Sequence, residues 1–139
     1  MSAAPAFAQA CTGRPSATRL FVTVTNVRSS EGLVAVTLYA DDSSRFLARR
    51  GSLYVGRVPA RAGTTRVCIH VPAPGVYGLA VYHDADANRS FNRNAIGLPA
   101  EGYGFSNDAP TLFGLPSFRR VRLAVPRDGF STSVTLRYP

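Results

Sequence analysis

The chain has 139 residues, 45% of them hydrophobic and 17% charged, which is typical of one globular domain with a single core. Its formal net charge is +8, and all 16 basic residues are arginines, scattered without zinc-finger spacing, basic heptads or an RNA-binding aromatic motif, so nucleic acid is a disfavoured partner. The longest apolar run, Val76 to Tyr82, is far too short to span a bilayer core of about 30 Å, which excludes a transmembrane helix.

The first ten residues end in Ala8-Gln9-Ala10, the small-x-small pattern of a signal-peptidase site. We therefore expect residues 1–10 to be a residual leader or a disordered arm, residues 11–139 to form one domain, and the bacterial protein to be periplasmic or secreted. Two cysteines in an exported chain usually pair, so Cys11 and Cys68 are predicted to form a disulfide. Two buried free thiols and a lipidated Cys11 are the alternatives.

Alternation of apolar and polar residues predicts the first two strands. Residues 19–27 place Leu20, Val22 and Val24 on one face, as a strand with one face on a core requires. Residues 32–40 repeat the pattern after a polar turn. The two runs are therefore predicted to form a hairpin.

The alternation breaks in residues 41–51, which predict one or two helical turns with Ser43 or Ser44 as the N-cap and Gly51 as the stop. Five later runs predict strands, at residues 52–58 (a short edge strand), 65–71, 76–83, 119–125 and 131–138. The sequence thus predicts an all-β, Greek-key β-sandwich of about seven strands, transthyretin-like or immunoglobulin-like, with one short helix and one long loop. A small open barrel is the alternative.

Residues 84–118 have little periodicity and are rich in Asn, Gly and Pro, which predicts a long loop. Loops of this length inside a compact domain are usually functional. In the strand before it, Leu79, Val81 and His83 share one face with the apolar positions. We therefore expect His83 at the core-side end of that strand.

Oxygen-bearing side chains occupy every second position at the start of this loop, at Asp84, Asp86, Asn88, Ser90 and Asn92. Calcium loops place their ligands in this way. However, the sixth position is Arg89 where a sharp turn needs glycine, and the twelfth is Ala95 where a glutamate would complete the site. The pattern therefore favours a turn held by its own hydrogen bonds, with calcium at Asp84, Asp86 and Asn88 as the alternative.

His83, Asp84 and Ser106 supply the residue types of a catalytic triad. Ser106 lacks the G-x-S-x-G elbow, however, because residue 108 is an aspartate. We therefore predict no catalytic residue. The alternative is a small hydrolase that uses His83 with Asp86 or Glu101 as its partner acid.

Tyr103 and Phe105 belong to the run EGYGFSND and have two interpretations. Aromatic loop residues can line a groove for an apolar or carbohydrate ligand. They can equally cover the open edge of a small sandwich, and this interpretation is favoured because such sandwiches often need a loop to cap the core.

Residues 83–118 carry a specific series of motifs, HDADANRSFNRNAIGLPAEGYGFSND and then FGLPSF. They resemble the hallmark of an exported bacterial family classed as a domain of unknown function, H-D-x-N-x-N-G-x-x-D-x-N followed by G-I-P, E-G-Y-G-F-S-N and G-x-P-S-F. The chain departs from this hallmark at Asp86, Ala87, Arg89 and Asn92, which weakens a cation loop in this member.

The run PAPGVYGLAV is similar to a signature of transthyretin-like sandwiches, which occur in carboxypeptidase regulatory and starch-binding domains. Together the resemblances imply that fold, an exported location and no established activity. They assign no catalytic residue.

The sequence as a whole predicts an exported, non-catalytic module that acts at the cell envelope through its 84–118 loop, as a binding or structural unit. The sequence does not identify the partner, for which an anionic envelope component and a small ligand are the candidates, and calcium is the only cofactor that the loop pattern suggests. The candidate binding residues are His83, Asp84, Asp86, Asn88, Asn92, Asn94, Glu101, Tyr103, Phe105, Ser106 and Asn107.

Overall fold

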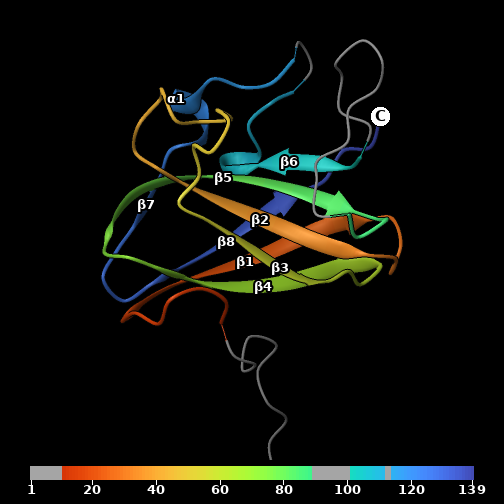
Figure 1. The fold of residues 1–139 in the computed structure, drawn as a ribbon, viewed down its shortest axis with the longest axis horizontal. Coiled ribbons are helices and arrows are strands. Elements are labelled where there is room, and N and C mark those ends of the chain that lie inside the picture. The colour runs from red at the N-terminus through yellow and green to blue at the C-terminus, as the bar shows by residue number, and fades with distance from the viewer. Residues whose placement is uncertain (1–10, 89–100, 112–113) are drawn as a thin grey trace, which may run out of the picture.

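The computed structural model describes residues 11–88, 101–111 and 114–139 (Figure 1). Its elements are, in chain order, β1 (Thr18–Val27), β2 (Leu33–Ala40), β3 (Tyr54–Pro59), β4 (Gly63–Val71), β5 (Gly75–Asp84), β6 (Tyr103–Phe105), the 3₁₀ helix η1 (Ser106–Asp108), α1 (Phe118–Val121), β7 (Leu123–Val125) and β8 (Phe130–Thr135). Two packed sheets confirm the predicted all-β sandwich. Among the described residues, no helix has the length and apolarity needed for a membrane span.

The strands divide into a three-stranded sheet, ordered β4-β1-β8, and a five-stranded sheet, ordered β3-β2-β5-β6, with β7 also paired to β5. β6 and β7 lie along the same edge of β5, because β6 pairs with Ala80–Tyr82 and β7 with Gly75–Tyr77. β1 and β8 are parallel. The strand that the sequence did not predict is β6, which lies inside the expected long loop.

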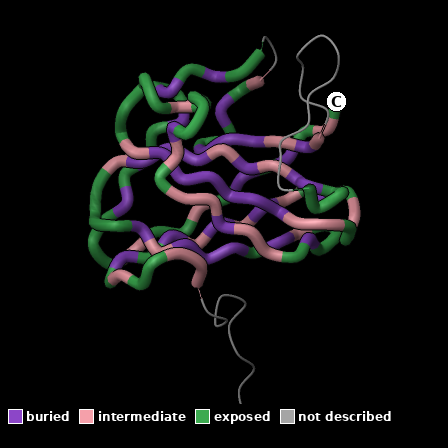
Figure 2. The backbone as a smooth tube through the Cα atoms, viewed as in Figure 1, coloured by how far each residue is buried: buried purple, intermediate pink, exposed green. Residues whose placement is uncertain are grey.

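The core fills the space between the sheets, where alternate residues of facing strands are buried (Figure 2). Leu20, Val22 and Val24 of β1 are fully buried, as the alternation predicted. A second, smaller cluster covers the outer face of the five-stranded sheet and consists of Tyr39, Phe105, Ala109, Phe118 and Val121, with Phe46 packed against it. The five-stranded sheet is therefore covered by apolar side chains on both of its faces.

The predicted hairpin of residues 19–27 with 32–40 is wrong. β1 belongs to the three-stranded sheet and β2 to the five-stranded sheet, so the chain crosses the core between them. Alternation specifies only that each strand has one apolar face. Two such faces can be buried by pairing in the same sheet or by packing against each other from two facing sheets, and the pattern does not distinguish these arrangements. The connections β4 to β5 and β7 to β8 cross between the sheets in the same manner.

The predicted helix at residues 41–51 is also wrong, because this segment forms a series of hydrogen-bonded turns. Leu47 and Arg50 both have a φ of 59°, in the left-handed region that interrupts a right-handed helix. Phe46 still contributes its apolar side chain, with its ring centroid 5.5 Å from that of Phe118. The short α-helix is α1, at the start of the segment predicted as a strand over 119–125.

Cys11 and Cys68 form the predicted disulfide. The next residue, Thr12, accepts a hydrogen bond from the amide of His70 (3.0 Å) and donates its own amide to the carbonyl of Cys68 (2.9 Å). These bonds lie on the edge of β4 that β1 leaves free. Residues 11–12 therefore cover part of a strand edge that would otherwise be open to pairing with another chain.

Opening this disulfide should destabilise the fold. The bond joins residues 57 positions apart, and a loop of that length contributes about 4 kcal/mol on the chain-entropy model. We expect dithiothreitol to lower the free energy of unfolding of the wild type by about that amount in urea titrations, and to leave a Cys11→Ser, Cys68→Ser double variant unchanged. Equal stability of the wild type with and without reductant would contradict this.

Candidate functional site

His83 lies on the core face of β5, as the alternation predicted, with only 2% of its surface exposed. Its Nε2 lies 2.7 Å from the carbonyl of Glu31, and its Nδ1 lies 2.7 Å from the hydroxyl of Tyr138. Because a carbonyl only accepts, the partners assign the proton of the neutral ring to Nε2, and Nδ1 then accepts from the hydroxyl. Both ring nitrogens are therefore used in structural hydrogen bonds.

Tyr138 connects this histidine to the loop between β1 and β2. Its hydroxyl oxygen accepts a 2.8 Å hydrogen bond from the amide of Arg28, and the guanidinium of Arg28 lies 4.1 Å from the centre of the ring. Burial raises the pKa of Tyr138 above its ordinary value, and the amide and charge of Arg28 oppose this shift. The network joins β5, the β1–β2 loop and the carboxyl-terminal segment.

Ser106 is also fully buried and has a structural role. Its hydroxyl accepts a 3.0 Å hydrogen bond from the amide of Leu79 and donates to the carbonyl of Val121. The serine therefore links β5 to α1. Because these partners differ from those of His83, the residue types of a triad do not come together.

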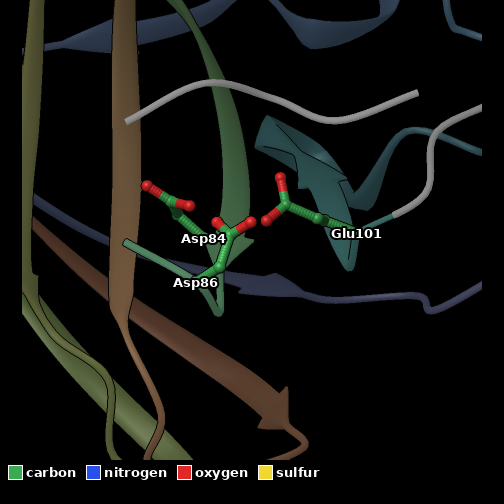
Figure 3. A group of neighbouring side chains, drawn as sticks. All are labelled: Asp84, Asp86 and Glu101. Carbon is green, nitrogen blue, oxygen red and sulfur yellow. The ribbon is translucent and has the colours of Figure 1, made fainter. Parts of the chain in front are cut away.

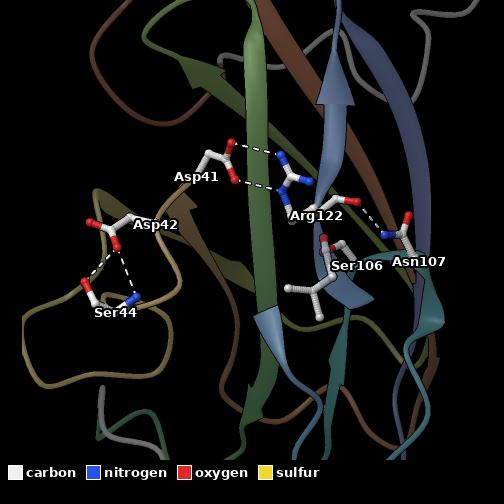
Figure 4. A network of polar contacts seen from close by, with 7 residues as sticks. Asp41, Asp42, Ser44, Ser106, Asn107 and Arg122 are labelled. Carbon is white, nitrogen blue, oxygen red and sulfur yellow. Dashed lines mark hydrogen bonds and ion pairs between the residues drawn. The ribbon is translucent and has the colours of Figure 1, made fainter. Parts of the chain in front are cut away.

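Polar contacts hold α1 and its neighbours over the outer face of the sheet (Figure 4). The side-chain amide of Asn107 donates to the carbonyls of Arg120 (3.2 Å) and Arg122 (2.8 Å). The guanidinium of Arg122 donates to both carboxylate oxygens of Asp41, at 2.8 and 3.0 Å, and holds the pKa of that carboxyl below its usual range. The ion pair is exposed, so it contributes little to the free energy of unfolding and serves mainly to position the end of α1 beside Asp41.

Three carboxylates gather where β5 ends and β6 begins. Asp84 ends β5, Asp86 lies in the turn that follows, and Glu101 comes two residues before β6. Their carboxylate oxygens lie within 4.8 Å of one another, and Figure 3 shows Asp86 and Glu101 extending toward each other with Asp84 beside them. Asp84 is fully buried, Glu101 is half-buried and Asp86 is exposed. We call these three residues the carboxylate cluster.

The cluster follows from the register of β5 and β6. Tyr82 pairs with Tyr103, and the amide of His83 donates to the carbonyl of Gly102 at 2.8 Å, so the same register places Asp84 opposite Glu101. Like charges directly opposite each other across two strands are destabilising. A bound cation would remove that repulsion.

Asn88 closes the turn that carries Asp86. Its backbone amide donates to Asp84 (3.1 Å) and to Asp86 (3.3 Å), and its side-chain amide donates to the other oxygen of Asp86 (3.2 Å). Ala87 has a left-handed φ of 54°, which this tight turn requires. The turn is therefore held by hydrogen bonds of the kind that the sequence favoured, and Asn88 supplies donors to both carboxylates.

Tyr103 and Phe105 lie on β6 rather than in a loop, and Phe105 is buried in the outer cluster. Beside them is a mostly apolar cavity of about 90 Å³ on the outer face of the sheet. Its lining consists of Thr37, Tyr39, Leu47, Ala80, Val81, Tyr82, Tyr103, Phe105 and Leu115. Asn92 and Asn94, also predicted as binding residues, lie outside the described residues.

The sequence did not indicate the partners of His83, because Tyr138 is 55 residues away and no local pattern connects the two. It named Asp86 and Glu101 only as alternative partner acids of His83, not as neighbours of each other. Their proximity depends on β6, a strand of three residues that is too short to show alternation.

Comparison with known proteins gives one family. Residues 22–133 match the family described as "Uncharacterized protein conserved in bacteria (DUF2141)". No curated protein and no solved structure matches the chain.

The hydrogen bonds of Tyr138 can be tested by removing its hydroxyl alone. Tyr138→Phe keeps the ring but leaves the amide of Arg28 and the Nδ1 of His83 without this partner, so we expect the free energy of unfolding to fall by about 1–3 kcal/mol. Tyr54→Phe is the matched control, since Tyr54 packs against the same core and its hydroxyl has no hydrogen bond among the described residues. Equal effects of the two variants in urea titrations would contradict the network.

Proposed function

The chain belongs to the bacterial family DUF2141, and we propose that it acts as an exported, non-catalytic β-sandwich module that binds its ligand at the cell envelope through the 84–118 segment. The observation that carries the proposal is the division of polar groups in that region. His83 and Ser106 are buried and use their polar atoms in structural hydrogen bonds. Asp86, Glu101 and Tyr103, in contrast, reach the surface.

The disulfide supports export. Disulfides persist in oxidising compartments such as the bacterial periplasm and are rare where thiols are kept reduced. Cys11 and Cys68 are the only cysteines of the chain, and both are in this bond. An oxidising location is therefore the environment in which Cys11 stays bonded to Cys68 of β4.

Export and the absence of catalysis can be tested together. Protein isolated from the native bacterium should lie outside the cytoplasm and show no free thiol on alkylation, and the purified protein should leave a panel of esters and glycosides unchanged. Turnover that disappears in a folded His83→Gln variant would instead support the hydrolase alternative. Fully reduced protein in the cytoplasm would contradict export.

The carboxylate cluster favours a second function, the binding of a divalent cation and of Ca²⁺ in particular. Calcium takes oxygen ligands from carboxylates, and extracellular sites bind it with dissociation constants of about 10⁻⁴–10⁻³ M. Asp84, Asp86 and Glu101 bring three such groups within 4.8 Å. Glu101 supplies the third carboxylate, in place of the residue that the local loop pattern lacks.

Calcium should therefore raise the melting temperature. If the dissociation constant is about 1 mM, free Ca²⁺ at about ten times that concentration adds roughly 1.4 kcal/mol to the free energy of unfolding. Glu101→Gln should lose most of this increase in melting temperature, because the variant has lost a charged ligand.

Asp128→Asn is the matched control for this experiment. Asp128 lies in the turn before β8, at the opposite end of the sandwich, where the carbonyl of Arg127 contacts the start of β1. The control should respond to calcium as the wild type does. A wild type whose melting temperature is indifferent to calcium would exclude the cation site.

A further inference from the structure

A cavity of about 160 Å³ lies at the edge of the sandwich, where β6 of one sheet meets β8 of the other. A single water needs roughly 10–15 Å³, so the space admits a small molecule. The aromatic and polar residues of its lining are Tyr103, Phe105, Asp108, Thr111, Thr135 and Arg137. No member of the carboxylate cluster lines it.

Hydrogen bonds join β6 to the segment that follows β8 at the border of the cavity. Tyr103 and Arg137 exchange two backbone hydrogen bonds, at 2.8 and 3.0 Å. A Cβ at Gly104 would lie only 2.7 Å from the carbonyl oxygen of Thr135, so this close approach requires glycine. The cavity is therefore bounded by fixed backbone on both sides.

Asp108 is placed at the cavity by a tight turn. Asn107 and Asp108 are consecutive residues with left-handed φ values of 63° and 46°, a conformation that asparagine and aspartate adopt more readily than other residues with a side chain. The carboxylate of Asp108 accepts hydrogen bonds from the amide (2.7 Å) and the hydroxyl (3.3 Å) of Thr135. Its position is thus set before any ligand arrives.

The lining has the chemistry that recognises a sugar. Arg137 supplies donors, Asp108 supplies acceptors, and the hydroxyls of Thr111 and Tyr103 can supply both. One guanidinium and one carboxylate leave the lining without net formal charge, which matches a neutral ligand with many hydroxyls. The partly exposed ring of Tyr103 can pack against the C–H face of a sugar ring.

We propose that this cavity binds one neutral sugar residue, either as a free monosaccharide or as the end of an envelope polysaccharide. The inference rests on the proposed function, because it gives a ligand class to the binding segment, to which Tyr103, Phe105, Asp108 and Thr111 belong. The cavity is separate from the carboxylate cluster, since the two share no residue, so the sugar is expected to bind without calcium.

Titration followed by amide NMR tests the site, because it detects millimolar affinities and locates them. The probes are glucose, galactose, mannose and N-acetylglucosamine, then the corresponding short oligosaccharides, with glycine as a zwitterionic comparison. We expect amides of residues 103–111 and 135–137 to shift with at least one sugar. A response to monosaccharides indicates a free sugar, and a response to oligosaccharides alone indicates a chain end.

Arg137→Gln should weaken that response about tenfold or more, because it removes a charged hydrogen-bond donor, and Thr111→Val should weaken it without changing charge. Arg127→Gln, in the turn at the other end of the molecule, is the matched control and should bind as the wild type does. Silence toward every sugar, shifts confined to other regions, or a response to glycine alone would overturn the sugar site. None of these outcomes bears on turnover or export, so failure here is distinguishable from failure of the proposed function.

Discussion

The two-residue period of β5 is the constraint on which the rest of the molecule depends. This strand pairs with β2 along one edge and with both β6 and β7 along the other, so it is central to the five-stranded sheet. One of its faces enters the main core and the other is covered by the outer cluster. Because neighbouring residues must face opposite ways, His83 is directed into the core and Asp84 away from it. Adjacent polar residues thus acquire unrelated roles, one in a buried hydrogen-bond network and the other in the carboxylate cluster.

Glycines decide how closely the outer elements approach this strand. A Cβ at Gly78 would come within 2.8 Å of the ring of Phe118, and one at Gly102 would overlap the ring of Tyr138. Gly104 serves the same purpose against β8. Since glycine weakens an isolated strand, β6 is held by what it contacts, namely β5, the end of β8 and the tyrosine that hydrogen-bonds to His83. Its two ends border the two candidate sites, with Glu101 just before it and the edge cavity beside it.

The sequence predicted what depends on alternation and failed where position depends on distant partners. It predicted the buried face of β1, the inward direction of His83, the disulfide and the sandwich class. It paired β1 with β2 wrongly, because an apolar face specifies burial and not the sheet that provides it. It placed the helix at residues 41–51, where left-handed residues at Leu47 and Arg50 allow only turns. It could not bring Glu101 to Asp84, because their proximity exists only once three residues of β6 have paired with β5.

The distribution of charge gives the carboxylate cluster its significance. The chain has only 8 acidic residues against 16 basic ones, yet three acids meet at one end of β5. With so few acidic residues, such a grouping is not expected from composition alone, and repulsion between carboxylates on neighbouring strands opposes it. A cation there would convert repulsion between the β5 turn and the segment before β6 into attraction, and so would add to the hydrogen bonds that already hold β6. The edge cavity is bordered by the same strand, so a ligand that needs β6 in place would bind more tightly when the cation is present. Thermodynamic linkage requires the reverse as well, so the bound sugar would raise the affinity for the cation by the same factor. Two sites without a residue in common would then be coupled through a strand of three residues.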